Sequence, residues 1–172
     1  GTSVTPFDED TQNGDIIGYD ITDEPEMEPT VHAYVKELAQ TYGQDNRILI
    51  WNIWNEAGNS QRMEKSVSLM KKVFEWMREE DVKQPLTADI WGAGAEHPYG
   101  WLKNPGIYAD VERTAIELSD IITFHFYGDY AHSRMYIKCL KEYGRPMINT
   151  EWMHRPYRSI IQTHLPLWKK EK

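Results

Sequence analysis

The feature that most constrains the fold is an apolar run that ends in a carboxylate. From Ile48 to Trp54 the side chains are apolar except for Asn52, and most are β-branched or aromatic. Such a run is typical of a strand buried on both faces, as in parallel sheets. It continues directly into Asn55 and Glu56. A carboxylate at a buried strand end is costly unless it is paired or functional. Glu56 is therefore either a functional residue or a cap for the turn that follows.

Three later segments repeat the pattern of an apolar strand that ends in chemically useful groups. These segments and their side chains are 85–91 with Trp91, 121–127 with His125 and Tyr127, and 147–152 with Glu151 and Trp152. The spacing of apolar residues predicts helices at 30–42, 60–80, 109–118, 133–143 and 159–170, where Pro166 could kink or shorten the last one. Strands that alternate with helices indicate βαβ units and a parallel sheet. The predicted fold class is therefore α/β.

Two architectures fit this order, a doubly wound sheet and a (β/α)8 TIM barrel. An open sheet binds its ligand at one switch point, whereas a barrel gathers all its strand ends around one mouth. Because each predicted strand ends in functional groups, the barrel fits better. The sequence also has no Gly-rich phosphate loop after a strand, which argues against nucleotide binding.

The length of 172 residues suits one domain with its own core. Residues 1–29 form a loop-rich lead-in, within which 15–21 could be a short strand. Residues 92–106 form an unusually long connection, rich in Gly, Pro and aromatic residues, that contains Trp101. Long loops of this kind often line functional sites, so this segment is a predicted site wall.

Composition excludes several classes of partner. The formal charge of -8 and the pI near 5.2 argue against binding to nucleic acid or to anionic membranes. No stretch reaches the roughly 18 apolar residues of a membrane span. The start of the chain shows no signal peptide, and the lone Cys139 leaves the compartment undetermined. The 7 Trp and 10 Tyr residues offer flat rings that can stack on sugars.

Three ordered motifs resemble those of the retaining glycoside hydrolases of clan A, such as families 2 and 5. Residues 49–59 resemble the strand-four signature of these (β/α)8 barrels, 120–127 resemble strand six, and 148–152 resemble strand seven. The family motif commonly reads Asn-Glu-Pro, and Ala57 stands here in place of the Pro. The resemblance therefore implies a partial barrel that covers about strands four to seven.

The resemblance also implies roles for the residues that match. Glu56 would be the general acid/base and Glu151 the nucleophile in a retaining cleavage of β-glycosidic bonds of oligo- or polysaccharides. Asn55 would hold the sugar 2-hydroxyl, while His125 and Tyr127 would shape the site, with Tyr127 bonded to the nucleophile. Trp91, Trp101 and Trp152 are candidate sugar platforms. A retaining pair requires carboxyl groups about 5 to 5.5 Å apart.

The expected partners follow from the same reading. The substrate would be a carbohydrate, and no cofactor or metal is expected. Strands one, two and eight are absent from the predicted elements, so we expect the exposed strand edges to need missing barrel segments or to self-associate. The resemblance implies a secreted or periplasmic enzyme.

Two alternatives stay open. One is a non-catalytic carbohydrate-binding or interaction module made from part of a barrel. The other is a metal-dependent hydrolase that uses His97, His125, His132 or His154, although the chain lacks the close His pairs typical of metal sites.

Overall fold

A computed structural model of the chain describes residues 22, 24–59, 64–90 and 108–171. Strands and helices alternate along the described residues, as predicted for an α/β protein. The strands are β1 (Trp51–Trp54), β2 (Leu86–Ala88), β3 (Ile122–His125) and β4 (Met147–Glu151). The helices are α1 (Glu28–Tyr42), α2 (Lys65–Glu79), α4 (Asp110–Leu118), α5 (Tyr130–Lys141) and α6 (Ile161–Lys170), with short 3-10 turns η3 (Pro25–Met27) and η4 (Arg155–Tyr157). Among these residues, none of the helices has the length and apolar character needed to cross a membrane.

The four strands lie in sequence order and run parallel. β1 pairs with β2, and β3 pairs with β4. The two pairs are joined by a parallel bridge between Ile90, just beyond β2, and Phe124 of β3. Two backbone hydrogen bonds hold this bridge, from Ile90 N to Thr123 O and from His125 N to Ile90 O, each 3.1 Å long. The predicted parallel order is therefore confirmed.

Side chains reinforce the short strand β2. The Leu86 N–H donates to the Asp120 carboxylate over 2.8 Å, and the Ala88 N–H donates to Ser119 Oγ over 3.0 Å. The hydroxyls of Thr87 and Thr123 lie 2.7 Å apart and link β2 to β3 directly. Buried backbone groups need hydrogen-bond partners. Ser119 and Asp120, which directly follow α4, supply these partners to the N–H groups of β2.

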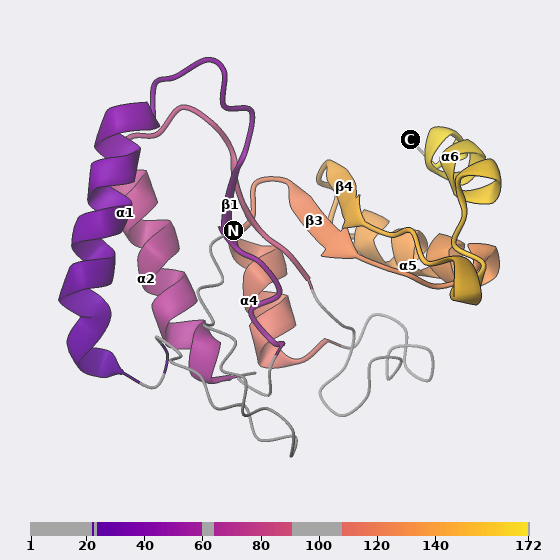
Figure 1. Ribbon diagram of the computed structural model, residues 1–172, viewed down its shortest axis with the longest axis horizontal. Coiled ribbons are helices and arrows are strands. Elements are labelled where there is room, and N and C mark those ends of the chain that lie inside the picture. Colours follow the sequence, from indigo (N-terminus) through magenta and orange to yellow (C-terminus); the bar gives the residue numbers. More distant parts are fainter. Residues whose placement is uncertain (1–21, 23, 60–63, 91–107, 172) are drawn as a thin grey trace.

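The helices pack against the strands through two hydrophobic clusters of side chains. The first contains residues of α1, α2, β1 and β2, and the second contains residues of β3, α5 and α6. In Figure 1 α1 and α2 lie together at one end, α5 and α6 lie at the other, and the strands and α4 lie between them. α4 serves both clusters, because Val111 and Ala115 belong to the first and Ile116 to the second.

Some predicted boundaries and burial patterns are wrong. β1 begins at Trp51 rather than residue 48, and Leu49 is 80% exposed. In β4 half-buried and exposed positions alternate from Met147 to Thr150, and Ile148 is 40% exposed. Within the described residues β1 and β4 are the outer strands, each paired on one edge only, and they are less buried than the inner strands β2 and β3, whose positions are all buried.

Several helix boundaries differ by one to three residues from the predicted ones. α5 begins at Tyr130, three residues earlier than predicted, because the Asp129 side chain caps it by accepting from the His132 N–H over 3.0 Å. α6 runs through Pro166 without ending there. The short strand predicted at 15–21 lies outside the described residues, as do the first residues of the helix predicted at 60–80.

Candidate active site

Glu56 follows β1 and is held from two sides. Its backbone adopts φ 53°, a left-handed conformation that is uncommon outside glycine and recurs at functional sites. Its Oε1 lies 2.5 Å from Nδ1 of His125, and its Oε2 accepts a 2.7 Å hydrogen bond from the Asn59 side chain. The side chain is 14% exposed. The carboxylate is therefore fixed in position and still reachable from solvent.

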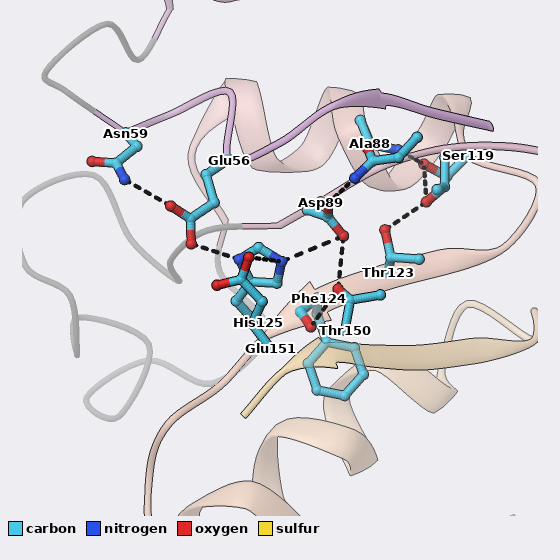
Figure 2. Close-up of polar contacts among 12 residues, drawn as sticks. Glu56, Asn59, Ala88, Asp89, Ser119, Thr123, Phe124, His125, Thr150 and Glu151 are labelled. Carbon is cyan, nitrogen blue, oxygen red and sulfur yellow. Dashed lines mark hydrogen bonds and ion pairs between the residues drawn. The ribbon is translucent and has the colours of Figure 1, made fainter. Parts of the chain in front are cut away.

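Glu151 ends β4 and faces the same histidine. Its Oε2 accepts a hydrogen bond from the Tyr127 hydroxyl, and its Oε1 lies 3.5 Å from Nε2 of His125. One carboxylate oxygen of Glu56 and one of Glu151 lie within 4.8 Å of each other. Figure 2 shows both carboxylates reaching the His125 ring. The ends of β1 and β4, which are far apart in sequence, thus bring two carboxylates close together.

Asp89 is a member of this network that the sequence analysis missed. It directly follows β2, and its side chain is 1% exposed. One oxygen accepts from the Asn52 side chain, and the other accepts from Thr150 Oγ1 over 2.9 Å. Asp89 Oδ1 also lies 3.6 Å from Nε2 of His125 (Figure 2). An Asp inside an apolar strand segment was a usable signal, because buried carboxylates are rare without partners.

The electrostatics of the site raise the pKa values of both His125 and Tyr127. Burial alone would lower the pKa of His125, but the hydrogen bond with Glu56 and the charges of Asp89 and Glu151 together raise it above its usual value. Burial raises the pKa of Tyr127, and the hydrogen bond to Glu151 raises it further. Tyr127 therefore stays a hydroxyl donor at neutral pH. Glu56 and His125 can thus hold a proton between them. The neighbouring Glu151 carboxylate is 44% exposed and could react with an electrophile.

The other predicted site residues have varied positions. Asn55 is half-buried directly before Glu56. Trp152 is half-buried, and its ring stacks on His164 of α6 with centroids 5.7 Å apart and meets Trp168 edge-on. Trp91 and Trp101 lie outside the described residues. Of the three candidate platforms, Trp152 alone can be described, and its ring is part of an aromatic cluster with α6.

The same site also brings together side chains that could hold a metal ion. In the part of the chain that the structure describes, one group brings potential ligand atoms within 4.8 Å of each other, namely Glu56, His125 and Glu151. Hydrogen bonds already engage Glu56 with His125 and Glu151 with Tyr127. His132 pairs instead with Asp129 at 3.1 Å, and His97 lies outside the described residues. The three side chains could therefore serve either as an acid–base group or as ligands of an ion, which would have to replace these hydrogen bonds.

Comparison with known proteins gives one result that bears on this site. Residues 8–171 match a family model described as Cellulase (glycosyl hydrolase family 5). No curated protein matches the chain. The matched range includes every residue of the carboxylate network.

Proposed function

Because the chain belongs to glycosyl hydrolase family 5, a clan A family of glycosidases, we propose that Glu56 and Glu151 carry out a retaining hydrolysis of β-glycosidic bonds. The substrate would be an oligo- or polysaccharide. The family has a (β/α)8 barrel. We assign β1 to β4 to strands four to seven of that barrel and residues 1–172 to one catalytic domain.

The observation that carries the proposal is the separation of the two carboxylates. Their closest oxygens lie within 4.8 Å. Retaining glycosidases hold their carboxyl groups about 5 to 5.5 Å apart, whereas inverting enzymes hold them about 6.5 to 9.5 Å apart to admit a water. The spacing therefore supports a nucleophile that reaches the anomeric carbon directly.

In the first step Glu56 acts as the acid and Glu151 as the nucleophile. Oε1 of Glu151 forms a bond to the anomeric carbon while the bond from that carbon to the leaving oxygen breaks. The proton of Glu56 goes to the leaving oxygen, so an alcohol departs and a glycosyl ester of Glu151 remains. Tyr127 holds Oε2 of Glu151 and so directs Oε1 toward the sugar.

In the second step the roles reverse. Glu56, now a carboxylate, takes a proton from a water whose oxygen attacks the anomeric carbon. The bond to Glu151 breaks, and the sugar leaves with its original configuration. Asn55 is proposed to hold the sugar 2-hydroxyl in both steps. Trp91, Trp101 and Trp152 are proposed to stack on neighbouring sugar rings.

The exposed strand edges suggest the partners of this domain. Leu49 beside β1 is 80% exposed, and Ile148 of β4 is 40% exposed. Unpaired strand edges with apolar side chains attract further strands. We propose that these edges pair with other strands of the barrel or, in their absence, with a second copy of the chain.

The test is a hydrolysis assay on aryl β-glycosides and soluble β-glucans, with proton NMR of the first sugar released. We expect a β-configured product, and a slow fluorosugar substrate should label Glu151, as mass spectrometry of the digested protein would show. The Glu151→Gln variant should give neither product nor label. Sugar binding without turnover would instead support the carbohydrate-binding alternative, and an α-configured product would refute retention.

A further inference from the structure

The buried carboxylate of Asp89 connects all four described strands at the site. Asp89 follows β2, and its side chain contacts one residue from each of the other strands. These are Asn52 in β1, His125 in β3 and Thr150 in β4. Thr150 directly precedes Glu151, so the contacts of Asp89 reach both sides of the carboxylate pair. Both of its oxygens act as acceptors, which is the role of a carboxylate.

The two ring nitrogens of His125 have different surroundings. Nδ1 lies 2.5 Å from Oε1 of Glu56. Nε2 is buried without a conventional hydrogen-bond partner and faces Asp89 Oδ1 at 3.6 Å and Glu151 Oε1 at 3.5 Å. A bare lone pair on Nε2 would face two carboxylate oxygens in a buried space, whereas an N–H there is attracted to both. The surroundings therefore favour a proton on Nε2.

We infer that Asp89 is a positioning residue that keeps a proton on Nε2 of His125, so that Nδ1 accepts from Glu56 and holds its acid proton in place. This inference rests on the proposed function of Glu56. The partner of a histidine ring nitrogen commonly decides which nitrogen carries the proton. In this site Asp89 does not touch the sugar and acts only through His125.

Asp89 is better suited to this task than the other carboxylates near His125. In the described residues the charged groups that face His125 are Glu56 after β1, Asp89 after β2 and Glu151 in β4. The side chain of Glu151 is 44% exposed and that of Asp89 is 1% exposed, so solvent screens Asp89 least. Glu151 also loses its charge when it forms the glycosyl ester, whereas Asp89 takes no part in that bond.

The direct test compares Asp89→Asn with the unaltered protein by nitrogen-15 NMR of the histidine rings, with His125 identified from a His125→Gln variant. In the unaltered protein we expect the neutral His125 ring to carry its proton on Nε2. In Asp89→Asn the population with the proton on Nδ1 should rise. Asp110→Asn is the matched control, because it makes the same chemical change on a side chain that is 64% exposed and lies on α4.

A second readout is the pH profile of kcat/KM on a substrate with a poor leaving group. The alkaline limb reports the loss of the proton that Glu56 and His125 hold between them. A nearby charge such as that of Asp89 typically shifts a pKa by about 1 to 3 units. Asp89→Asn should therefore move the alkaline limb to lower pH by about that much. Asp110→Asn should leave the limb in place. A purely structural role would lower the rate at all pH values equally.

The inference is overturned if the unaltered protein carries the proton on Nδ1, a result that needs no variant to fold. It is also overturned if Asp89→Asn folds and matches Asp110→Asn in tautomer and in pH profile. The NMR measurement does not require turnover. A protein with the Nε2 tautomer and no glycosidase activity would therefore count against the proposed function alone.

Discussion

Replacing Glu56 by Gln should remove the proton of the proposed general acid and leave the surrounding contacts in place. In the protein Oε2 of Glu56 accepts from Asn59, and Oε1 lies 2.5 Å from Nδ1 of His125. A glutamine can accept from Asn59 through its oxygen and donate to an unprotonated Nδ1 through its amide. The change is nearly isosteric and affects a side chain that is 14% exposed.

The expected effects on stability and on catalysis differ in size. Exchanging one hydrogen-bonding group for another that keeps both contacts should change the free energy of unfolding by no more than about 1 kcal/mol. General acid catalysis contributes about 10²- to 10⁴-fold, which corresponds to about 3 to 5 kcal/mol of barrier. Because the catalytic effect is several times larger, a rate loss in a folded Glu56→Gln variant reports on the proton.

The assay is a series of aryl β-glycosides whose leaving phenols span a wide range of acidity. For poor leaving groups kcat/KM should fall about 10²- to 10⁴-fold, because departure of these groups requires protonation. For the most acidic phenols the loss should stay below about 10-fold, because such phenolates depart unaided. Azide should accelerate turnover of the smaller Glu56→Ala variant by attacking the glycosyl ester without needing a base.

The control is circular dichroism and chemical unfolding of each variant, which shows that the protein remains folded. An equal loss of kcat/KM across the series would refute the assignment of Glu56 as the acid. A β-glycosyl azide as the product of Glu56→Ala would support the assignment of Glu151 as the nucleophile. An α-glycosyl azide would contradict it.

Three further changes test other parts of the site and the fold. Tyr127→Phe removes the hydrogen-bond donor to Glu151, whose side chain is 44% exposed and open to water. We expect kcat/KM to fall about 5- to 30-fold, equivalent to about 1 to 2 kcal/mol. Unchanged steady-state kinetics would show that Tyr127 does not assist. The folded-state pKa of His125 is raised, so its stabilising contribution is complete below the unfolded pKa of about 6.5 and is lost as the pH rises through the folded value. Denaturant unfolding should therefore show the stability gap to His125→Gln shrinking over that window, and a gap that grows with pH would contradict this sign. Leu49→Lys places a charge on an apolar side chain that is 80% exposed, so light scattering should show less self-association, and no change would count against the proposed edge contact.

The sequence predicted the order of the strands better than their limits. The alternation of apolar runs with amphipathic segments indicates βαβ units, and the parallel order of β1 to β4 confirms that interpretation. Residues 48–50 are as apolar as the strand they precede, yet Leu49 is exposed. Burial requires a neighbouring strand or helix on each side, and local composition carries no information about that neighbour.

The strand-end carboxylates were predictable, but their connections were not. Glu56 and Glu151 stand at the ends of apolar runs, which is a local signal. The contacts of Asp89 come from Asn52, 37 residues before it, and from Thr150, 61 residues after it. Likewise, the stacking of Trp152 on His164 depends on where α6 returns to the sheet. Such pairings follow from the path of the whole chain and not from any window of sequence.

The two hydrophobic clusters anchor the two carboxylates of the site separately. Glu56 is anchored to the first cluster, since the adjoining Ala57 is buried there and accepts a 2.6 Å hydrogen bond from Ser66. Glu151 is anchored to the second cluster, since its carbonyl accepts from the Phe126 N–H over 2.9 Å.

The contacts that join β2 to β3 therefore set the distance between Glu56 and Glu151. These contacts are the bridge of Ile90 with Phe124 and the pairing of the Thr87 and Thr123 hydroxyls. A substitution at this junction should thus change the separation of the two carboxylates without altering either one.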